Sequence, residues 1–356
     1  MVILFPAATL PRRSTNCFRK YDEELKINNF ICFDLEGPLS PQDNAYDLMS
    51  LIPEGDGLFE LISRYDDLLT MEGREDYEPG DTLALIVPFL LLHKIREKDI
   101  TDLARKASLT KGAGDLISEL KSQGWEIFCI TTTYQQYAHY ITSGIGIPLE
   151  HVAATPFPLD KFNSKLSKDD ICLLEKAEEE FLKLRQSTDD KLIKSKLDDF
   201  FWGKLPQTPL GKLIRSVKPV GGQRKVSALT RFALDNSQPL SEWVVVADSI
   251  TDFKMLKTVD QAGGLSIGFN ANQYALPYAT MSLASTHLSD LLPVLETWRN
   301  CGRTGVEKQV EEPVVDPDTD RRNFHWLAKK GTDIYDVISL HRKLRKVVRE
   351  KAGELG

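Results

Sequence analysis

Four short apolar segments, each followed at once by polar or acidic residues, constrain the fold of this chain more than any other feature. They are Asn29–Phe33, Trp125–Ile130, Trp243–Ala247 and Gly264–Phe269. Continuous rather than alternating apolar runs indicate strands that are buried on both faces, as in a parallel sheet covered by helices. Helical patterns at Lys111–Gln123 and Lys225–Leu234 precede the second and third runs. The alternation predicts an α/β fold with a doubly wound parallel sheet.

Two long segments interrupt this alternation, so the predicted core is discontinuous. It comprises residues 29–43, 107–159 and 218–300, and an N-terminal extension at 1–28 precedes it. The first insertion, 44–106, contains helical patterns at Leu58–Leu69 and Asp81–Lys94. It directly follows the loop that ends the first strand, and we expect it to cover the carboxyl ends of the strands as a helical cap.

The second insertion, at 160–217, is highly charged. Ser167 and Asp170 resemble a capping box there, and apolar residues follow at helical spacing. We expect a helical hairpin or one long helix. Two roles stay open for this insertion. One is a purely structural element, and the other is a surface that binds a second copy of the chain or another protein.

The tail at 301–356 begins with acidic residues and ends in an amphipathic helical pattern from Thr332 onward. Its apolar positions are Ile334, Val337, Ile338, Leu344 and Val348. Its basic positions are Arg342, Lys343, Arg345, Lys346 and Arg349. We expect this helix to dock on the core with its basic face in solvent. The alternative is that residues 332–350 bind a protein partner.

Composition limits the environment and the partners of the chain. Its 356 residues carry a formal net charge of −7, which disfavours non-specific binding to nucleic acid or acidic lipid. The five cysteines are scattered without CxxC spacing, as expected of reduced thiols in a cytoplasmic protein. The apolar segment Leu83–Leu92 is too short to cross a bilayer, so we expect no membrane insertion.

The residues that end the predicted strands are suited to binding phosphate and a metal ion. In an open parallel sheet, ligands bind beyond the carboxyl ends of the strands. Those ends carry Asp34 and Glu36, then Thr131, Thr132 and Thr133, and then Asp248 and Asp252; Lys225 opens the helix before the third strand. Carboxylates are the ligands that Mg²⁺ prefers, and a phosphoryl group needs cations and hydrogen-bond donors around it.

A carboxylate so placed can act as a nucleophile and form an aspartyl-phosphate. A second carboxyl group two residues later can protonate the leaving oxygen and then activate water. Each of these residues taken alone has a structural explanation, as a turn residue, a helix cap or a surface lysine. Their occurrence together, at three strand ends and in this order, favours the chemical interpretation.

The pattern resembles the haloacid dehalogenase superfamily. The matching residues are Asp34-Leu35-Glu36-Gly37-Pro38-Leu39, Thr131, Lys225, Asp248 and Asp252. Their order and spacing look like the phosphoserine phosphatase branch, some of whose relatives carry the same DLEG first motif. The resemblance covers about residues 28–145 and 218–297. A further likeness, at Tyr77-Glu78-Pro79-Gly80-Asp81-Thr82, is to an archaeal group that resembles energy-converting hydrogenase subunit R.

The resemblance implies a Rossmannoid core with a C1-type cap, and it implies roles for individual residues. Asp34 would be the nucleophile and a metal ligand. Glu36 would be the general acid/base and would bind metal through its backbone carbonyl. The remaining metal ligands would be Asp248 and Asp252. Phosphoryl oxygens would be held by Thr131, Thr132, Gly37 and Lys225, with Arg224 as the rival to Lys225.

The function expected from this resemblance is Mg²⁺-dependent hydrolysis of a small phosphorylated metabolite. Two alternatives stay open: a phosphotransferase that uses the same aspartyl-phosphate, and a non-catalytic subunit or scaffold that keeps the fold. The usual first motif has Asp where this chain has Glu36. Because a misplacement of about 1 Å can cost about 100-fold in rate, this departure argues against fast hydrolysis.

Overall fold

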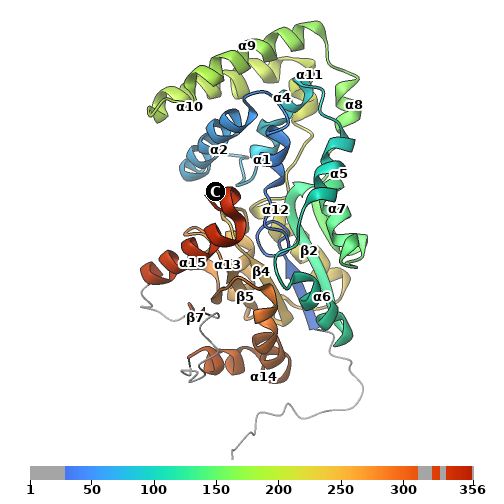
Figure 1. The fold of residues 1–356 in the computed structure, drawn as a ribbon, viewed down its shortest axis with the longest axis vertical. Helices are drawn as coiled ribbons and strands as arrows, with labels where there is room; N and C mark the ends of the chain where they lie inside the picture. The colour runs from blue at the N-terminus through green and yellow to red at the C-terminus, as the bar shows by residue number, and fades with distance from the viewer. Residues whose placement is uncertain (1–28, 312–322, 329–333, 355–356) are drawn as a thin grey trace, which may run out of the picture.

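The computed structural model describes residues 29–311, 323–328 and 334–354, so the expected N-terminal extension at 1–28 lies outside the described residues. A seven-stranded sheet forms the centre of the core (Figure 1), in the spatial order β3-β2-β1-β4-β5-β6-β7. The strands are β1 Asn29–Phe33, β2 Trp125–Tyr134, β3 Val152–Thr155, β4 Trp243–Ala247, β5 Leu265–Phe269, β6 Met281–Ala284 and β7 Asn323–Trp326.

The first six strands pair in parallel, and β7 pairs antiparallel with β6. Their order is that of a doubly wound Rossmann-like sheet, so the predicted fold class is confirmed. The order of the connections reverses between β1 and β4, which is where such folds bind their ligands.

The two faces of the sheet are covered by different helices, and side chains of β1 alternate between the two faces. Ile31 and Phe33 belong to one apolar cluster and Phe30 and Cys32 to the other. The first cluster contains residues of α6 (Ala113–Ser122), α7 (Gln135–Gly144) and α14 (Leu292–Glu311), and the second contains residues of α12 (Gln223–Asp235), α13 (Phe253–Ala262) and α15 (Ile334–Arg349). Burial on both faces explains why the strands are continuous apolar runs.

Both insertions fold into helices, and together they form a layer above the sheet (Figure 1). The first insertion holds α1 Asn44–Met49, α2 Gly55–Glu72, α3 Thr82–Leu85, α4 Val87–Leu92 and α5 Glu97–Lys106. The second holds α8, which begins at Leu159, together with α9 Lys168–Leu184, α10 Asp190–Asp198, a π-helical turn at Asp199–Lys204 and α11 Pro209–Ile214. α9 and α10 form the helical hairpin, one of the two predicted forms.

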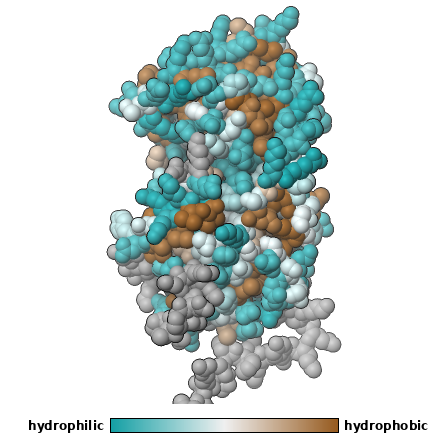
Figure 2. All heavy atoms as spheres, viewed as in Figure 1, coloured by the Kyte–Doolittle hydropathy of each residue, from teal (hydrophilic) through white to brown (hydrophobic). Residues whose placement is uncertain are grey.

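Ser167 and Asp170 make the predicted capping box at the start of α9. In Figure 2, hydrophilic residues cover much of the visible surface of this layer, with hydrophobic patches between them. The apolar pattern at Asp81–Lys94 is split into α3 and α4, because Pro88 lies in the first turn of α4 and cannot donate a backbone hydrogen bond.

The tail is more closely integrated than predicted. Its helix α15 docks on the core, but its basic residues are not all in solvent. Arg345 and Arg349 are 3% and 7% exposed and lie in line with buried Val337 and His341 at four-residue spacing. The expectation of a wholly solvated basic face was therefore wrong. Of the helices in the described part of the chain, none is both long enough and apolar enough to span a membrane.

Candidate active site

The amino group of Lys225 lies between two carboxylates at the carboxyl edge of the sheet. Its Nζ is 3.1 Å from Oδ2 of Asp34 and 2.5 Å from Oδ1 of Asp252. Asp34 directly follows β1, Asp252 follows β4 after a short loop, and Lys225 lies in the first turn of α12. Burial alone would lower the pKa of Lys225, but the two carboxylates outweigh it and raise that pKa. The ammonium group therefore stays charged.

Asp34 is a buried carboxylate at the floor of the site. One oxygen accepts a hydrogen bond from the backbone N–H of Leu35 at 2.7 Å, and the other contacts Lys225. Burial and the neighbouring carboxylate of Asp252 raise the pKa of Asp34 well above its usual range, against the opposing effect of Lys225. A further cation at this position would relieve the repulsion between the carboxylates.

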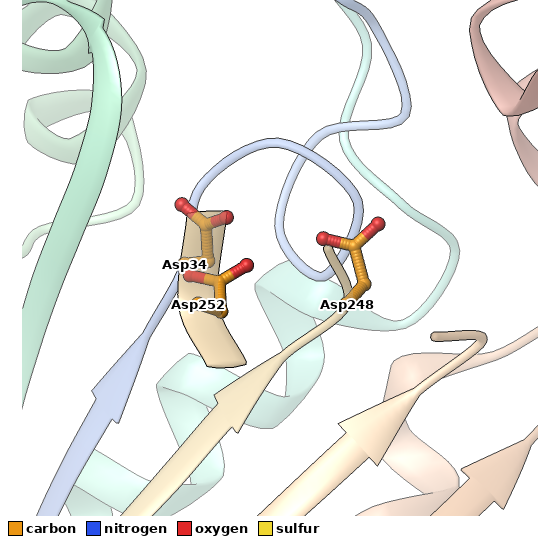
Figure 3. A group of neighbouring side chains, drawn as sticks. All are labelled: Asp34, Asp248 and Asp252. Atoms are coloured by element: carbon orange, nitrogen blue, oxygen red, sulfur yellow. The ribbon is translucent and has the colours of Figure 1, made fainter. Parts of the chain in front are cut away.

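Asp34, Asp248 and Asp252 converge on one point (Figure 3). They each place one oxygen within 4.8 Å of the oxygens of the other two, and all three residues are buried. Oδ1 of Asp248 is buried and has no hydrogen-bond partner among the described residues. Oδ2 of Asp252 accepts from the backbone N–H of Ser249 at 3.1 Å and from its hydroxyl at 2.9 Å. Three buried carboxylates with an unpartnered oxygen fit a hard divalent cation such as Mg²⁺.

Gly37 brings the loop after β1 against Asp248. Its φ is +104°, and a Cβ atom there would lie 2.4 Å from the carboxylate of Asp248. The backbone N–H of Gly37 donates to the carbonyl of Ser40 at 2.6 Å. That N–H is thus directed into its own loop, and Gly37 packs closely against Asp248. Its contact with phosphate stays a prediction.

Glu36 lies at the edge of the site and is partly buried. Its Oε1 accepts a hydrogen bond of 2.7 Å from the backbone N–H of Asn44, at the start of α1. Burial and the nearby carboxylate of Asp43 raise the pKa of Glu36 well above its usual range. A carboxyl group with a raised pKa can donate a proton and later accept one, as a general acid/base must.

The threonines after the predicted second strand continue β2, because their β-branched side chains suit an extended backbone. The hydroxyl of Thr131 accepts from the N–H of Thr133 at 3.3 Å, and Thr132 donates to the carbonyl of Val220 at 3.1 Å. Of the two threonines predicted to hold phosphate, Thr132 lines the cavity described next, and Thr131 does not.

Lys225 and Arg224 have different partners. Arg224 makes a two-point ion pair with Asp81, with N–O distances of 2.5 and 3.0 Å, and also donates to the carbonyl of Pro219. It therefore joins the first insertion to the core, and Lys225 is the cation that contacts Asp34.

A cavity of about 110 Å³ opens above Asp34. Its walls come from both the core and the first insertion, which contributes Phe59, Ser63, Asp66, Asp67, Thr82 and Leu83. Two arginines of the first insertion, Arg64 and Arg74, do not line this cavity. Arg64 pairs with Asp190, and the guanidinium of Arg74 stacks 4.3 Å from the ring centre of Trp202. Both connect the two insertions.

Two residues of the site escaped the sequence-based prediction. Arg345 and Arg349 of α15 both donate to Oδ2 of Asp248, Arg349 at 3.0 Å. Arg349 also donates to the backbone carbonyls of Pro41 and Gln42 at 3.1 and 3.4 Å. The signal that could have found them is their four-residue spacing from Val337 and His341, which places all four on one helix face.

Comparison with known proteins gives a structural likeness. No protein-family model and no curated protein sequence matches the chain. The structure of gene product AF1437 from Archaeoglobus fulgidus matches with a TM-score of 0.80 and 25% identity, over 92% of this chain and 99% of that one. The likeness extends through nearly the whole of both chains.

Phosphoserine phosphatases are also among the similar structures, at lower similarity. An apo phosphoserine phosphatase has a TM-score of 0.48 and 16% identity, over 75% of this chain and 98% of its own. A probable phosphoserine phosphatase from Vibrio cholerae has a TM-score of 0.45 and 15% identity, over 78% of this chain and 66% of its own.

Proposed function

We propose that this protein hydrolyses small phosphomonoesters through a phosphoryl group carried on Asp34, with Mg²⁺ as its cofactor. The observation that carries the proposal is the close grouping of Asp34, Lys225, Asp248 and Asp252 at the carboxyl edge of the sheet, beneath a cavity that Asp34 lines. A turn or cap residue has no need of a buried lysine 3.1 Å from its carboxylate.

In the proposed reaction, an oxygen of Asp34 attacks phosphorus, and the bond from phosphorus to the substrate oxygen breaks. Glu36 gives its proton to that leaving oxygen. The ammonium group of Lys225 stabilises the negative charge on the phosphoryl oxygens. Glu36, now ionised, takes a proton from the water that attacks the aspartyl-phosphate, and phosphate leaves with Asp34 restored.

The cation has its own place in the proposal. Mg²⁺ would be held by carboxylate oxygens of Asp34, Asp248 and Asp252 and by the backbone carbonyl of Glu36, and Asp252 would also orient Lys225. When bound, it supplies positive charge that neutralises the phosphoryl oxygens. The first insertion would exclude bulk water and select the leaving group, because it provides one wall of the cavity.

The proposal is tested by locating the phosphoryl group. Enzyme quenched in acid during turnover of a reactive aryl phosphate is digested and mapped by mass spectrometry. We expect an acyl-phosphate on Asp34 and none in Asp34→Asn, because an amide oxygen is a poor nucleophile. Glu36→Gln should still form the adduct and lose it more slowly. Phosphate on a Ser, Thr or His, or an Asp34→Asn enzyme that stays active without deamidation, would refute the mechanism.

A further inference from the structure

The cavity above Asp34 is strongly acidic for a site that is to hold a phosphate ester. Five of its lining residues are carboxylic acids: Asp34, Glu36, Asp43, Asp66 and Asp67. Of the described residues that line it, only two carry positive charge, and both come from α15: Arg345 and Arg349. Lys225 lies beneath the cavity floor rather than in its lining.

Formal charges show what α15 contributes. Without α15, the three buried carboxylates of Asp34, Asp248 and Asp252 have one lysine, Lys225, beside them, and the cavity walls add further acids, so a phosphate dianion would meet a strongly negative site. The two guanidinium groups of α15 bring two positive charges against Asp248. The arginines therefore make the site less repulsive to an incoming anion.

The two arginines are held in place by the fold. Their side chains are almost wholly buried, and both contact Oδ2 of Asp248, whereas Oδ1 of Asp248 has no hydrogen-bond partner within the described part of the chain. Arg349 is also tied to the loop after β1 through two backbone carbonyls. Figure 1 shows α15 running from beside the sheet toward the helical layer, and the contacts of Arg345 and Arg349 with Asp248 place its last turns at the site.

His341 fixes the position of this helix. Its Nδ1 accepts from the backbone N–H of Ala271 at 2.9 Å, and its Nε2 is 3.0 Å from the hydroxyl of Ser282 in β6. Burial lowers the pKa of His341 to about 3, so the ring is neutral and can act as an acceptor. The helix is therefore anchored one turn before Arg345, and the guanidinium groups are presented without rearrangement.

We propose that Arg345 and Arg349 supply the positive charge with which this cavity binds the phosphoryl anion, so the C-terminal helix is part of the active site rather than a surface for a protein partner. Arginine suits this task because its planar donor fork matches phosphate oxygens and its charge does not titrate. The assignment rests on the proposed function, since it assumes that the cavity receives a phosphate ester.

The test measures binding of inorganic phosphate to the full-length protein by titration calorimetry, with Mg²⁺ present. Arg345→Gln should bind phosphate about 10- to 100-fold more weakly, the range for one lost charge-assisted contact. Arg345→Lys keeps the charge without the fork and should recover part of the loss. Arg342→Gln is the matched control: it removes an equal charge from the same helix, but its side chain is exposed and contacts Gln273 instead. It should bind like the wild type.

Circular dichroism checks that each variant folds, because removing Arg345 leaves Asp248 with one fewer partner. If Arg345→Gln does not fold, Arg349→Gln provides the same comparison at the second guanidinium. Unchanged or tighter phosphate binding by a folded Gln variant would overturn the assignment while leaving the aspartyl-phosphate mechanism intact. A wild-type protein that neither binds phosphate nor forms the Asp34 adduct would overturn both.

Discussion

Asp66 is a carboxyl group buried in the wall of the cavity, at 6% exposure, and it accepts a hydrogen bond from the hydroxyl of Tyr77. Burial raises its pKa from 3.8 to about 7. Between these values the folded protein holds a proton that the unfolded chain has lost. The free energy of unfolding therefore falls as pH rises through this window, by about 1.4 kcal/mol per pH unit, and this loss is complete above pH 7.

Asp66→Asn removes this dependence, because an amide does not titrate and its oxygen can still accept from Tyr77. We expect the variant to lose less stability than the wild type between pH 5 and pH 8, and to be the more stable of the two at pH 8. Thermal unfolding at both pH values measures the difference. Asp235→Asn, at an exposed aspartate of α12, should follow the wild type. If wild type and Asp66→Asn lost the same stability between pH 5 and pH 8, folding would not raise the pKa of Asp66.

The sequence predicted some residues of the site far better than others. Asp34, Asp248 and Asp252 were predictable because they follow buried apolar runs, and the carboxyl ends of parallel strands share one edge of a sheet. Choosing Lys225 over Arg224 required the structure, since two adjacent positions in one helix differ in direction by about 100°. Arg345 was missed, because charge on an amphipathic helix normally indicates its solvent face, and that expectation outweighed its four-residue spacing from Val337 and His341.

At the scale of elements, the second insertion is joined to the first by aromatic packing. Phe181 of α9 is fully buried. Its ring centre lies 5.9 Å from that of Phe89 in α4, and 5.4 and 5.9 Å from those of Phe200 and Phe201. Together with the Arg64 and Arg74 contacts, this cluster makes one unit of the two insertions. The hairpin therefore supports the wall of the cavity from behind.

Phe181→Ala tests that support. Removing a buried ring leaves a cavity, and we expect the free energy of unfolding to fall by about 3–5 kcal/mol. Leu192→Ala, in the same insertion but 41% exposed, is the control and should change stability little. Denaturant unfolding followed by circular dichroism measures both. If Phe181→Ala proved as stable as Leu192→Ala, the packing of α9 on the first insertion would be contradicted.

Strands were predicted unevenly for a physical reason. The bounds of β1 and β4 were predicted correctly, because four consecutive apolar residues in β1 and five in β4 indicate strands buried on both faces. β3, β6 and β7 are four residues each and contain small or polar residues, so no periodic signal separates them from loops. These segments form strands because they pair with an adjacent strand of the sheet, and that pairing depends on tertiary structure.

At the scale of the whole molecule, the site collects charged groups from segments far apart in the chain. Asp34 comes from the end of β1, Lys225 from α12, Asp248 from the end of β4, and Arg345 from the last helix. Folding must bring Asp34, Asp248 and Asp252 together and bury them, which is unfavourable unless positive charge accompanies them. Any cation that binds this cluster therefore stabilises the whole fold.

This coupling leads to the last prediction, that Mg²⁺ raises the melting temperature and that excess chelator removes both the increase and the activity. A ligand that binds only the folded state at 100 times its dissociation constant adds about 2.7 kcal/mol to the free energy of unfolding. Asp248→Asn should abolish the increase, because its unpartnered oxygen belongs to the cluster. Asp235→Asn should keep it. Differential scanning calorimetry with Mg²⁺ and with chelator decides the matter independently of activity. If the wild-type melting curve were the same in millimolar Mg²⁺ as in chelator, Lys225 and the arginines alone would balance the charge of these carboxylates. Full activity in chelator would then mean that those side chains stabilise the phosphoryl group without a metal ion.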